Sequence, residues 1–243
     1  MHSDLIGAVI LLAYYLLFAV LLPTILKRWL RFPTELVRKI QHIVYSLSIF
    51  VLLELFGRWW TAIAAASLLV IVAYPALMLL ERLPWYRQTF VDRSRHGGEL
   101  RKQLLYVQAM FALLITVFWG LLGDSWRYVA AVAVMAWGFG DAAAALYGKA
   151  FGRRRVHHEL VDPGKTYEGT GAMIVCAGVA AFLTLVFYGQ QPWLSALLIT
   201  AAVAPLAGLI ELFSRRGTDT LTVPLAAAVV VMPLSYLFAL LGW

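Results

Sequence analysis

Asp141 is an acidic residue inside a long apolar run, directly after Gly140. A carboxylate at such a depth costs about 2.5–3.5 kcal/mol on membrane-insertion scales, so it indicates a functional or paired group. Spacings of four, three and four place Asp141, Ala145, Gly148 and Gly152 on one helical face. That face of small residues either packs closely against another helix or lets a phosphate or sugar approach the backbone.

A polar turn follows, with the sequence Asp162-Pro163-Gly164-Lys165-Thr166-Tyr167-Glu168-Gly169. Its Gly-Lys-Thr triplet does not belong to a P-loop, because the first glycine of that motif would fall at Glu159 and no strand precedes it. Lys165, Thr166 and the amides around Gly169 stand at a helix start, where an anion is stabilised. A phosphate site and a solvated turn are the two interpretations of this segment.

A third polar group, Arg38, Lys39 and His42, precedes the second apolar run. We expect Thr34 to cap this helix and Glu35 to lie in its first turn. Spacings of three and four bring the two cations and the imidazole onto one face, which suits a triphosphate. Contact with lipid headgroups is the alternative for Arg38 and Lys39.

Two more acids, Glu211 and Asp219, lie near the end of the seventh apolar run and just beyond it. Together with Asp141 they supply the hard oxygen ligands that Mg²⁺ prefers when it also holds phosphates. The alternative for Glu211 is an ion pair with Arg215, four residues further on.

These residues must be positioned by membrane helices, since a bilayer core needs about 20 apolar residues per helix. Eight such runs occur. They are Leu5–Leu26, Ile40–Phe56, Trp59–Leu80, Leu104–Leu122, Trp126–Gly148, Gly171–Tyr188, Trp193–Phe213 and Leu221–Leu241. The sequence therefore predicts an all-α integral membrane protein with about eight transmembrane helices in a single polytopic domain, 1–243.

The basic residues predict the orientation of these helices. Eighteen of the twenty Lys and Arg fall in alternate connections, and only Arg58 and Arg127 fall in the others. Because basic loops stay in the cytoplasm, both termini are expected outside and the polar groups described above on the cytoplasmic side. We expect the plasma membrane of a prokaryote.

The composition also agrees with an integral membrane protein and argues against a soluble one. Of the residues, 62% are hydrophobic and 14% charged, whereas soluble domains are nearer half apolar and a quarter charged. The net charge of +7 then indicates orientation and anionic headgroups, and we expect no nucleic acid partner. Cys176 is the one cysteine, which excludes an intrachain disulfide.

At these residues the chain resembles the CTP-dependent polyprenol kinase superfamily, which includes phytol, farnesol and dolichol kinases. Four elements carry the resemblance: Arg38-Lys39-x-x-His42; Gly140-Asp141-x-x-Ala144 with Gly148 and Gly152; Lys165-Thr166-x-Glu168-Gly169; and Glu211-x-x-Ser214 through Asp219 to Val223-Pro224. The family usually has Asp-Asn before the last span, whereas this chain has Asp219-Thr220.

The resemblance implies transfer of the γ-phosphoryl group of CTP to an isoprenoid alcohol such as phytol, farnesol, geranylgeraniol or a dolichol, with Mg²⁺ as cofactor. It implies catalytic roles for Asp141, Lys165 and Glu168, and metal ligation by Asp141, Asp219 and Glu211. The CTP-binding residues it implies are Arg38, Lys39, His42, Gly140, Gly148, Gly152, Lys165, Thr166 and Gly169.

Two rival functions remain open from the sequence. A cytidylyltransferase would use the same CTP and metal but make a CDP-lipid. A proton-coupled transporter could use the intramembrane acids as a relay, although Asp141 and Glu211 lie toward one surface of the bilayer and not at its middle.

Overall fold

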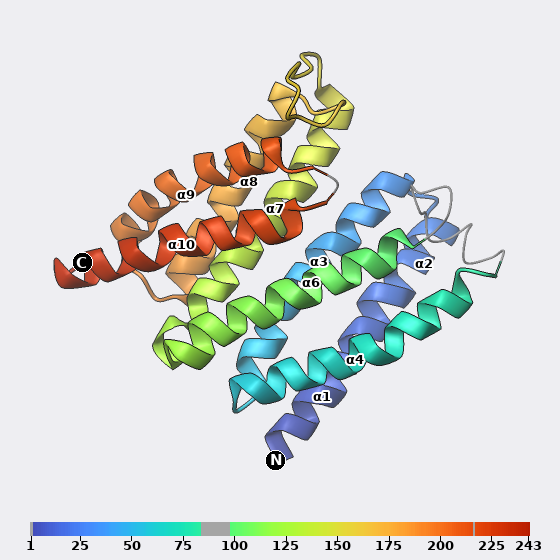
Figure 1. The fold of residues 1–243 in the computed structure, drawn as a ribbon, viewed down its shortest axis with the longest axis horizontal. Coiled ribbons are helices and arrows are strands. Elements are labelled where there is room, and N and C mark those ends of the chain that lie inside the picture. The colour runs from blue at the N-terminus through green and yellow to red at the C-terminus, as the bar shows by residue number, and fades with distance from the viewer. Residues whose placement is uncertain (1, 84–97, 216) are drawn as a thin grey trace. The chain divides into compact units, whose positions relative to one another are not determined.

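The computed structural model describes residues 2–83, 98–215 and 217–243, which form helices joined by shorter connections (Figure 1). Eight of the described helices are long and apolar enough to cross a membrane. They are Ser3–Arg28, Thr34–Glu54, Trp59–Leu80, Leu100–Leu121, Asp124–Phe151, Tyr167–Tyr188, Trp193–Phe213 and Asp219–Leu240. The predicted all-α architecture with eight spans is confirmed, and it fits an integral membrane protein.

The described chain divides into two compact units, Met1–Thr116 and Val117–Trp243, here called unit 1 and unit 2. The single domain over 1–243 stays a prediction, as does the side of the membrane on which each terminus lies. Of the basic residues behind the predicted orientation, Arg87, Arg93, Arg95 and Arg216 lie outside the described residues.

Unit 1 contains the first three spans and most of the fourth. Its helices are α1 (His2–Tyr14), the π-helix η1 (Tyr15–Leu21), α2 (Leu22–Arg28), α3 (Thr34–Glu54), α4 (Trp59–Leu80) and α6 (Glu99–Leu114). Helix α3 contacts α1, α2 and α4, and α4 also contacts α6. The Tyr14 hydroxyl donates to the carbonyl of Val44 at 2.7 Å, which fixes the first span against α3.

Unit 2 is built around one central helix. Its elements are the 3₁₀ turn η3 (Asp124–Trp126), α7 (Arg127–Phe151), α8 (Tyr167–Leu183), the π-helix η4 (Thr184–Tyr188), α9 (Trp193–Phe213) and α10 (Asp219–Leu240); the π-helix η2 (Ile115–Leu121) precedes them and includes the unit boundary. Helix α7 contacts α8, α9 and α10. Every residue of α7 from Tyr128 to Gly138 is buried, and Asp141, one turn further on, is half-buried.

Two local predictions differ from the structure. Helix α3 begins at Thr34, with Pro33 in the cap position and no side-chain cap, so Thr34 was wrongly predicted as the cap. The Thr34 hydroxyl instead accepts a hydrogen bond from the ammonium of Lys27. Glu35 lies in the first turn, as predicted. The three π-helical segments were not predicted, because a hydropathy pattern does not record a shift from i−4 to i−5 hydrogen bonding.

Candidate active site

The connection between α7 and α8 folds back on itself as a short hairpin, residues 152–166, at one end of unit 2 (Figure 1). Val156 donates its amide to the carbonyl of Lys165 at 2.9 Å, and Tyr167 donates to Arg154 at 3.1 Å. An isolated antiparallel bridge joins Arg155 to Thr166. The hairpin therefore holds Lys165 and Thr166 in fixed positions just before α8.

The ammonium of Lys165 contacts the C-terminal end of α9. It lies 3.1 Å from the Glu211 carboxylate Oε1 and donates to the backbone carbonyls of Glu211 and Ser214, the latter at 3.1 Å. Orphan carbonyls at a helix C-terminus favour a cation, and a buried carboxylate needs a partner. These three oxygen contacts, which we call the Lys165 clamp, join the hairpin to the end of α9.

Thr166, Glu168 and Gly169 build the start of α8. Thr166 is the N-cap, and its hydroxyl accepts from the Gly169 amide at 3.1 Å. The Glu168 carboxylate accepts from the Arg154 amide, with N–O distances of 3.2 and 3.3 Å. The polar residues of the predicted phosphate site thus stabilise the hairpin and the helix start in this structure.

The glycines of the predicted CTP site lie where α7 and α8 approach most closely. A Cβ on Gly169 would stand 2.9 Å from the carbonyl of Ala144, and a Cβ on Gly152 would stand 2.6 Å from Cγ2 of Thr166. A Cβ on Gly148 would stand 3.0 Å from the Thr166 hydroxyl, and one on Gly140 2.4 Å from the sulfur of Met173. Close helix packing, one of the two interpretations of this face, accounts for these glycines.

The start of α10 brings Asp219 beside α7. The indole N–H of Trp137 donates to Oδ2 of Asp219 over 3.4 Å, and Asp141 follows Trp137 by four residues, about one turn of α7. Ser214 and Thr222 join the two ends of the α9–α10 connection through a 2.8 Å contact between their hydroxyl oxygens. The last span therefore starts next to the helix that carries Asp141.

The three acids predicted to ligate a metal do not form one cluster. Within residues 2–83, 98–215 and 217–243, no group of three or more His, Cys, Asp or Glu side chains could hold a metal ion. Glu211 is engaged by Lys165, as described above. Asp219 accepts from Trp137, which precedes Asp141 by four residues in α7, and one or two carboxylates plus substrate phosphates are what Mg²⁺ commonly takes.

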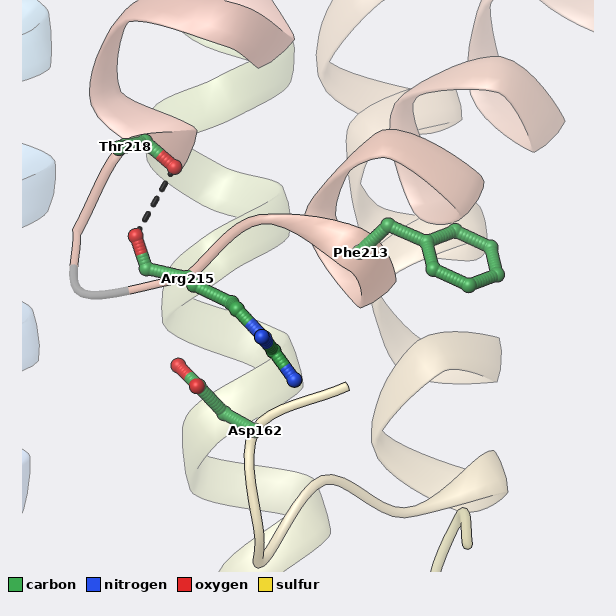
Figure 2. Close-up of a pocket in the computed structure, with 4 residues that line it drawn as sticks. All are labelled: Asp162, Phe213, Arg215 and Thr218. Carbon is green, nitrogen blue, oxygen red and sulfur yellow. Dashed lines mark hydrogen bonds between the residues drawn. The ribbon is translucent and has the colours of Figure 1, made fainter. Parts of the chain in front are cut away.

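A pocket of about 580 Å³ opens beside the Lys165 clamp. It is lined by Asp162 of the hairpin, by Phe213 at the end of α9, and by Arg215 and Thr218 of the α9–α10 connection. In Figure 2 the Asp162 and Arg215 side chains extend in opposite directions along the lining of the pocket. The lining of the pocket thus includes both a hydrogen-bond acceptor and a donor.

The remaining predicted residues lie in unit 1, at the start of α3. Lys39 and His42 are buried, each with 3% of its surface exposed. The His42 ring nitrogen Nδ1 lies 3.3 Å from the Gln103 amide of α6, and Arg38 pairs with Glu35 one turn earlier in α3.

Three of the four motifs therefore meet at one end of unit 2, although they are separated by tens of residues in the chain. The hairpin motif contacts α9 through Lys165 and α7 through its glycines, and α10 contacts α7 through Asp219. Trp137 and the pocket residues Phe213 and Thr218 were not predicted from the sequence. The spacing of Trp137, four residues before Asp141, was the available signal for that residue.

Comparison with known proteins identifies the family of this chain. A sequence model of the cytidylyltransferase family matches residues 5–239. A phytol kinase from Synechocystis sp. is 30% identical over 240 residues, which cover 95% of this chain and 93% of the relative. No solved structure matches the chain significantly. The chain therefore belongs to the cytidylyltransferase family, and the predicted resemblance to the polyprenol kinases is confirmed.

Proposed function

We propose that the protein is a CTP-dependent lipid kinase that phosphorylates a long-chain isoprenoid alcohol, with its active site facing the cytoplasm. The products are a lipid monophosphate and CDP. The similarity to a phytol kinase along almost the whole chain supports a kinase. The structural observation that carries the proposal is the meeting of three motifs beside a pocket of about 580 Å³ at one end of unit 2.

The reaction requires one bond to form and one to break. The alcohol oxygen bonds to the γ-phosphorus, the bond from that phosphorus to the β–γ bridging oxygen breaks, and CDP leaves with the bridging oxygen. The hydroxyl proton passes to a carboxylate. Positioning and charge neutralisation supply most of the rate enhancement in such transfers.

Glu168 is our first candidate for the proton acceptor. Its carboxylate accepts from the Arg154 amide, and an ionised carboxylate has further lone pairs for a substrate hydroxyl. His42 of unit 1 is the alternative acceptor. Both assignments rest on the family resemblance and are tested by substitution.

The phosphates need cationic partners. In unit 2, Lys165 would exchange one of its three present oxygen partners for a phosphate oxygen, while the hairpin keeps it in place. The amides at the start of α8 add partial positive charge at the same point. For unit 1, the family resemblance implies that Arg38, Lys39 and His42 also bind the nucleotide.

Asp141 and Asp219 would hold Mg²⁺, which neutralises the charge that develops on the phosphates. One of these two carboxylates is oriented by a neighbouring side chain. The Trp137 indole donates to Asp219 and fixes the carboxylate at the start of α10. Glu211, also predicted as a ligand, holds Lys165 in this structure.

The test is a labelling experiment with purified protein, Mg²⁺ and a panel of phytol, farnesol, geranylgeraniol and dolichol. Transfer of label from γ-labelled CTP to the lipid fraction is expected, with CDP as the second product. Incorporation of label from α-labelled CTP into lipid, together with release of pyrophosphate, would instead identify a cytidylyltransferase. An Asp141→Asn variant is the inactive control.

A further inference from the structure

The proposed reaction assigns no ligand to the pocket beside the Lys165 clamp. The described residues that line it come from the hairpin (Asp162), the end of α9 (Phe213) and the α9–α10 connection (Arg215 and Thr218). Its volume of about 580 Å³ falls within the roughly 300–1,000 Å³ typical of small-molecule sites. The pocket is therefore large enough for a nucleoside.

The walls of this pocket are fixed by contacts of their own. The amide of Lys165 donates to the carbonyl of Asp162 at 3.3 Å, so the acid belongs to the same turn as the clamp. On the other wall, the Thr218 hydroxyl donates to the carbonyl of Arg215 at 2.9 Å (Figure 2). The ring of Phe213 meets His158 of the hairpin edge-on, with centroids 5.7 Å apart.

The acid and the guanidinium offer a specific hydrogen-bonding pattern. A carboxylate accepts only, at up to four lone-pair sites, and a guanidinium donates only, through five N–H groups. Each therefore keeps capacity for a ligand even where the two side chains contact each other. A pocket lined by both an acceptor and a donor can complement a base edge that carries an amino group next to an acceptor nitrogen.

We propose that this pocket binds the cytosine base of the donor nucleotide and selects it over uracil. Asp162 accepts from the exocyclic amino group of cytosine, a pairing that carboxylates make with this base in nucleic acid recognition. Arg215 donates to the ring nitrogen and to the carbonyl oxygen beside it. Uracil presents a carbonyl oxygen where cytosine presents the amino group, and this oxygen would face the carboxylate. This inference rests on the proposed function and deepens it.

The experiment compares CTP with UTP as phosphoryl donors, using kcat/KM for each with the wild type and with Asp162→Asn. The carboxamide can donate to the uracil oxygen, so the variant should lower the preference for CTP over UTP by about tenfold or more. Glu159→Gln is the matched control, since Glu159 is an exposed acid of the same hairpin that does not line the pocket. It should leave the preference unchanged.

Arg215→Gln provides a second, independent variant, which should reduce kcat/KM for CTP more than for UTP. It keeps the test valid where Asp162→Asn does not fold. Wild-type transfer from CTP with an unchanged CTP-to-UTP ratio in the folded variants would overturn the base assignment alone. A wild type that transfers phosphoryl groups from neither nucleotide would overturn the proposed function and the base assignment with it.

Discussion

At the scale of single residues, Lys165 shows how one side chain can have a structural and a chemical role. Three oxygen atoms of α9 and its end surround its ammonium, and a lysine has three N–H donors. The residue thus stabilises the hairpin in this structure. A phosphate can bind only by replacing one of these partners, and this exchange would couple nucleotide binding to the position of α9.

Lys165→Ala should lower both stability and turnover. Removal of the ammonium leaves the Glu211 carboxylate, which is 8% exposed, without this partner, and we expect a loss of about 2 kcal/mol or more. Turnover should fall by roughly two orders of magnitude if the residue also contacts phosphate in the transition state. The measurements are the thermal midpoint in detergent and CTP-dependent alcohol phosphorylation.

Arg153→Ala is the matched control for that variant, because Arg153 is an exposed cation of the same hairpin. Its stability should change by less than about 0.5 kcal/mol. Equal small losses of turnover in the two variants would mean that Lys165 belongs to a general basic surface, and its assignment to the phosphates would be withdrawn.

Asp141→Asn should abolish Mg²⁺-dependent turnover, because the amide keeps the shape of the side chain but loses its charge. Elution from a sizing column should be that of the wild type, which checks folding. Asp219→Asn should impair turnover less, given the unusual Thr220 beside it. Near-normal activity of Asp141→Asn would contradict the metal assignment.

Trp137→Phe should raise the Mg²⁺ concentration needed for half-maximal turnover by roughly tenfold, since partners that orient a metal ligand typically matter by 10–100-fold. The variant removes the N–H that donates to Asp219. Trp119→Phe is the matched control. The Trp119 indole donates to Asp124, which lies just before the start of α7, whereas the hairpin follows the C-terminal end of that helix. An equal shift in both variants would show a general effect of tryptophan loss.

At the scale of helices and connections, the contact between α7 and α8 positions the hairpin. A run of small residues lets the two backbones approach, so that Gly152 and Gly169 lie against Thr166 and Ala144. Because Thr166 also caps α8, the same residue ends the hairpin and begins the helix. Packing of the two helices and geometry of the turn are therefore coupled.

Gly169→Ala should destabilise the protein by about 1–3 kcal/mol, the usual range for forcing extra atoms into a packed interface. The added Cβ would stand 2.9 Å from the carbonyl of Ala144, which belongs to a helix backbone and cannot move aside. Gly171→Ala, two residues on in α8, has open space around its Cβ and should be neutral or slightly stabilising. The thermal midpoints of the two variants are compared. A loss of stability only in Gly169→Ala would show that the close helix contact is the cause, and equal losses would show that α8 does not accept alanine at either glycine.

The sequence predicted the helices well and their mutual contacts poorly, for a physical reason. Hydropathy over about 20 residues records burial in a bilayer, so Trp59–Leu80 and Trp193–Phe213 were predicted with the bounds that the structure has. Contacts such as Lys165 with Glu211 join residues 46 positions apart, and no local period encodes them. The family resemblance named Lys165 and Glu211 as site residues but could not assign their partners.

At the scale of the whole molecule, the distribution of charge predicts that the reaction takes place on one side of the membrane. Eighteen of the twenty Lys and Arg fall in alternate connections, and the hairpin alone contains three consecutive arginines, Arg153 to Arg155. Basic loops are retained in the cytoplasm, where nucleotide is available. The apolar surface of the spans would meanwhile give an isoprenoid alcohol a route from the bilayer.

The orientation can be tested by thiol labelling in intact cells. On a Cys176→Ala background, which removes the chain's own thiol, His157→Cys places a cysteine on the exposed hairpin and Ser125→Cys places one on the exposed connection before α7. An impermeant reagent added outside should label Ser125→Cys and should label His157→Cys only after the cells are permeabilised, because the two positions flank opposite ends of α7. The reverse pattern would place the hairpin outside, away from cytoplasmic CTP. The proposed donor would then have to be abandoned, even though the fold and the family would stand.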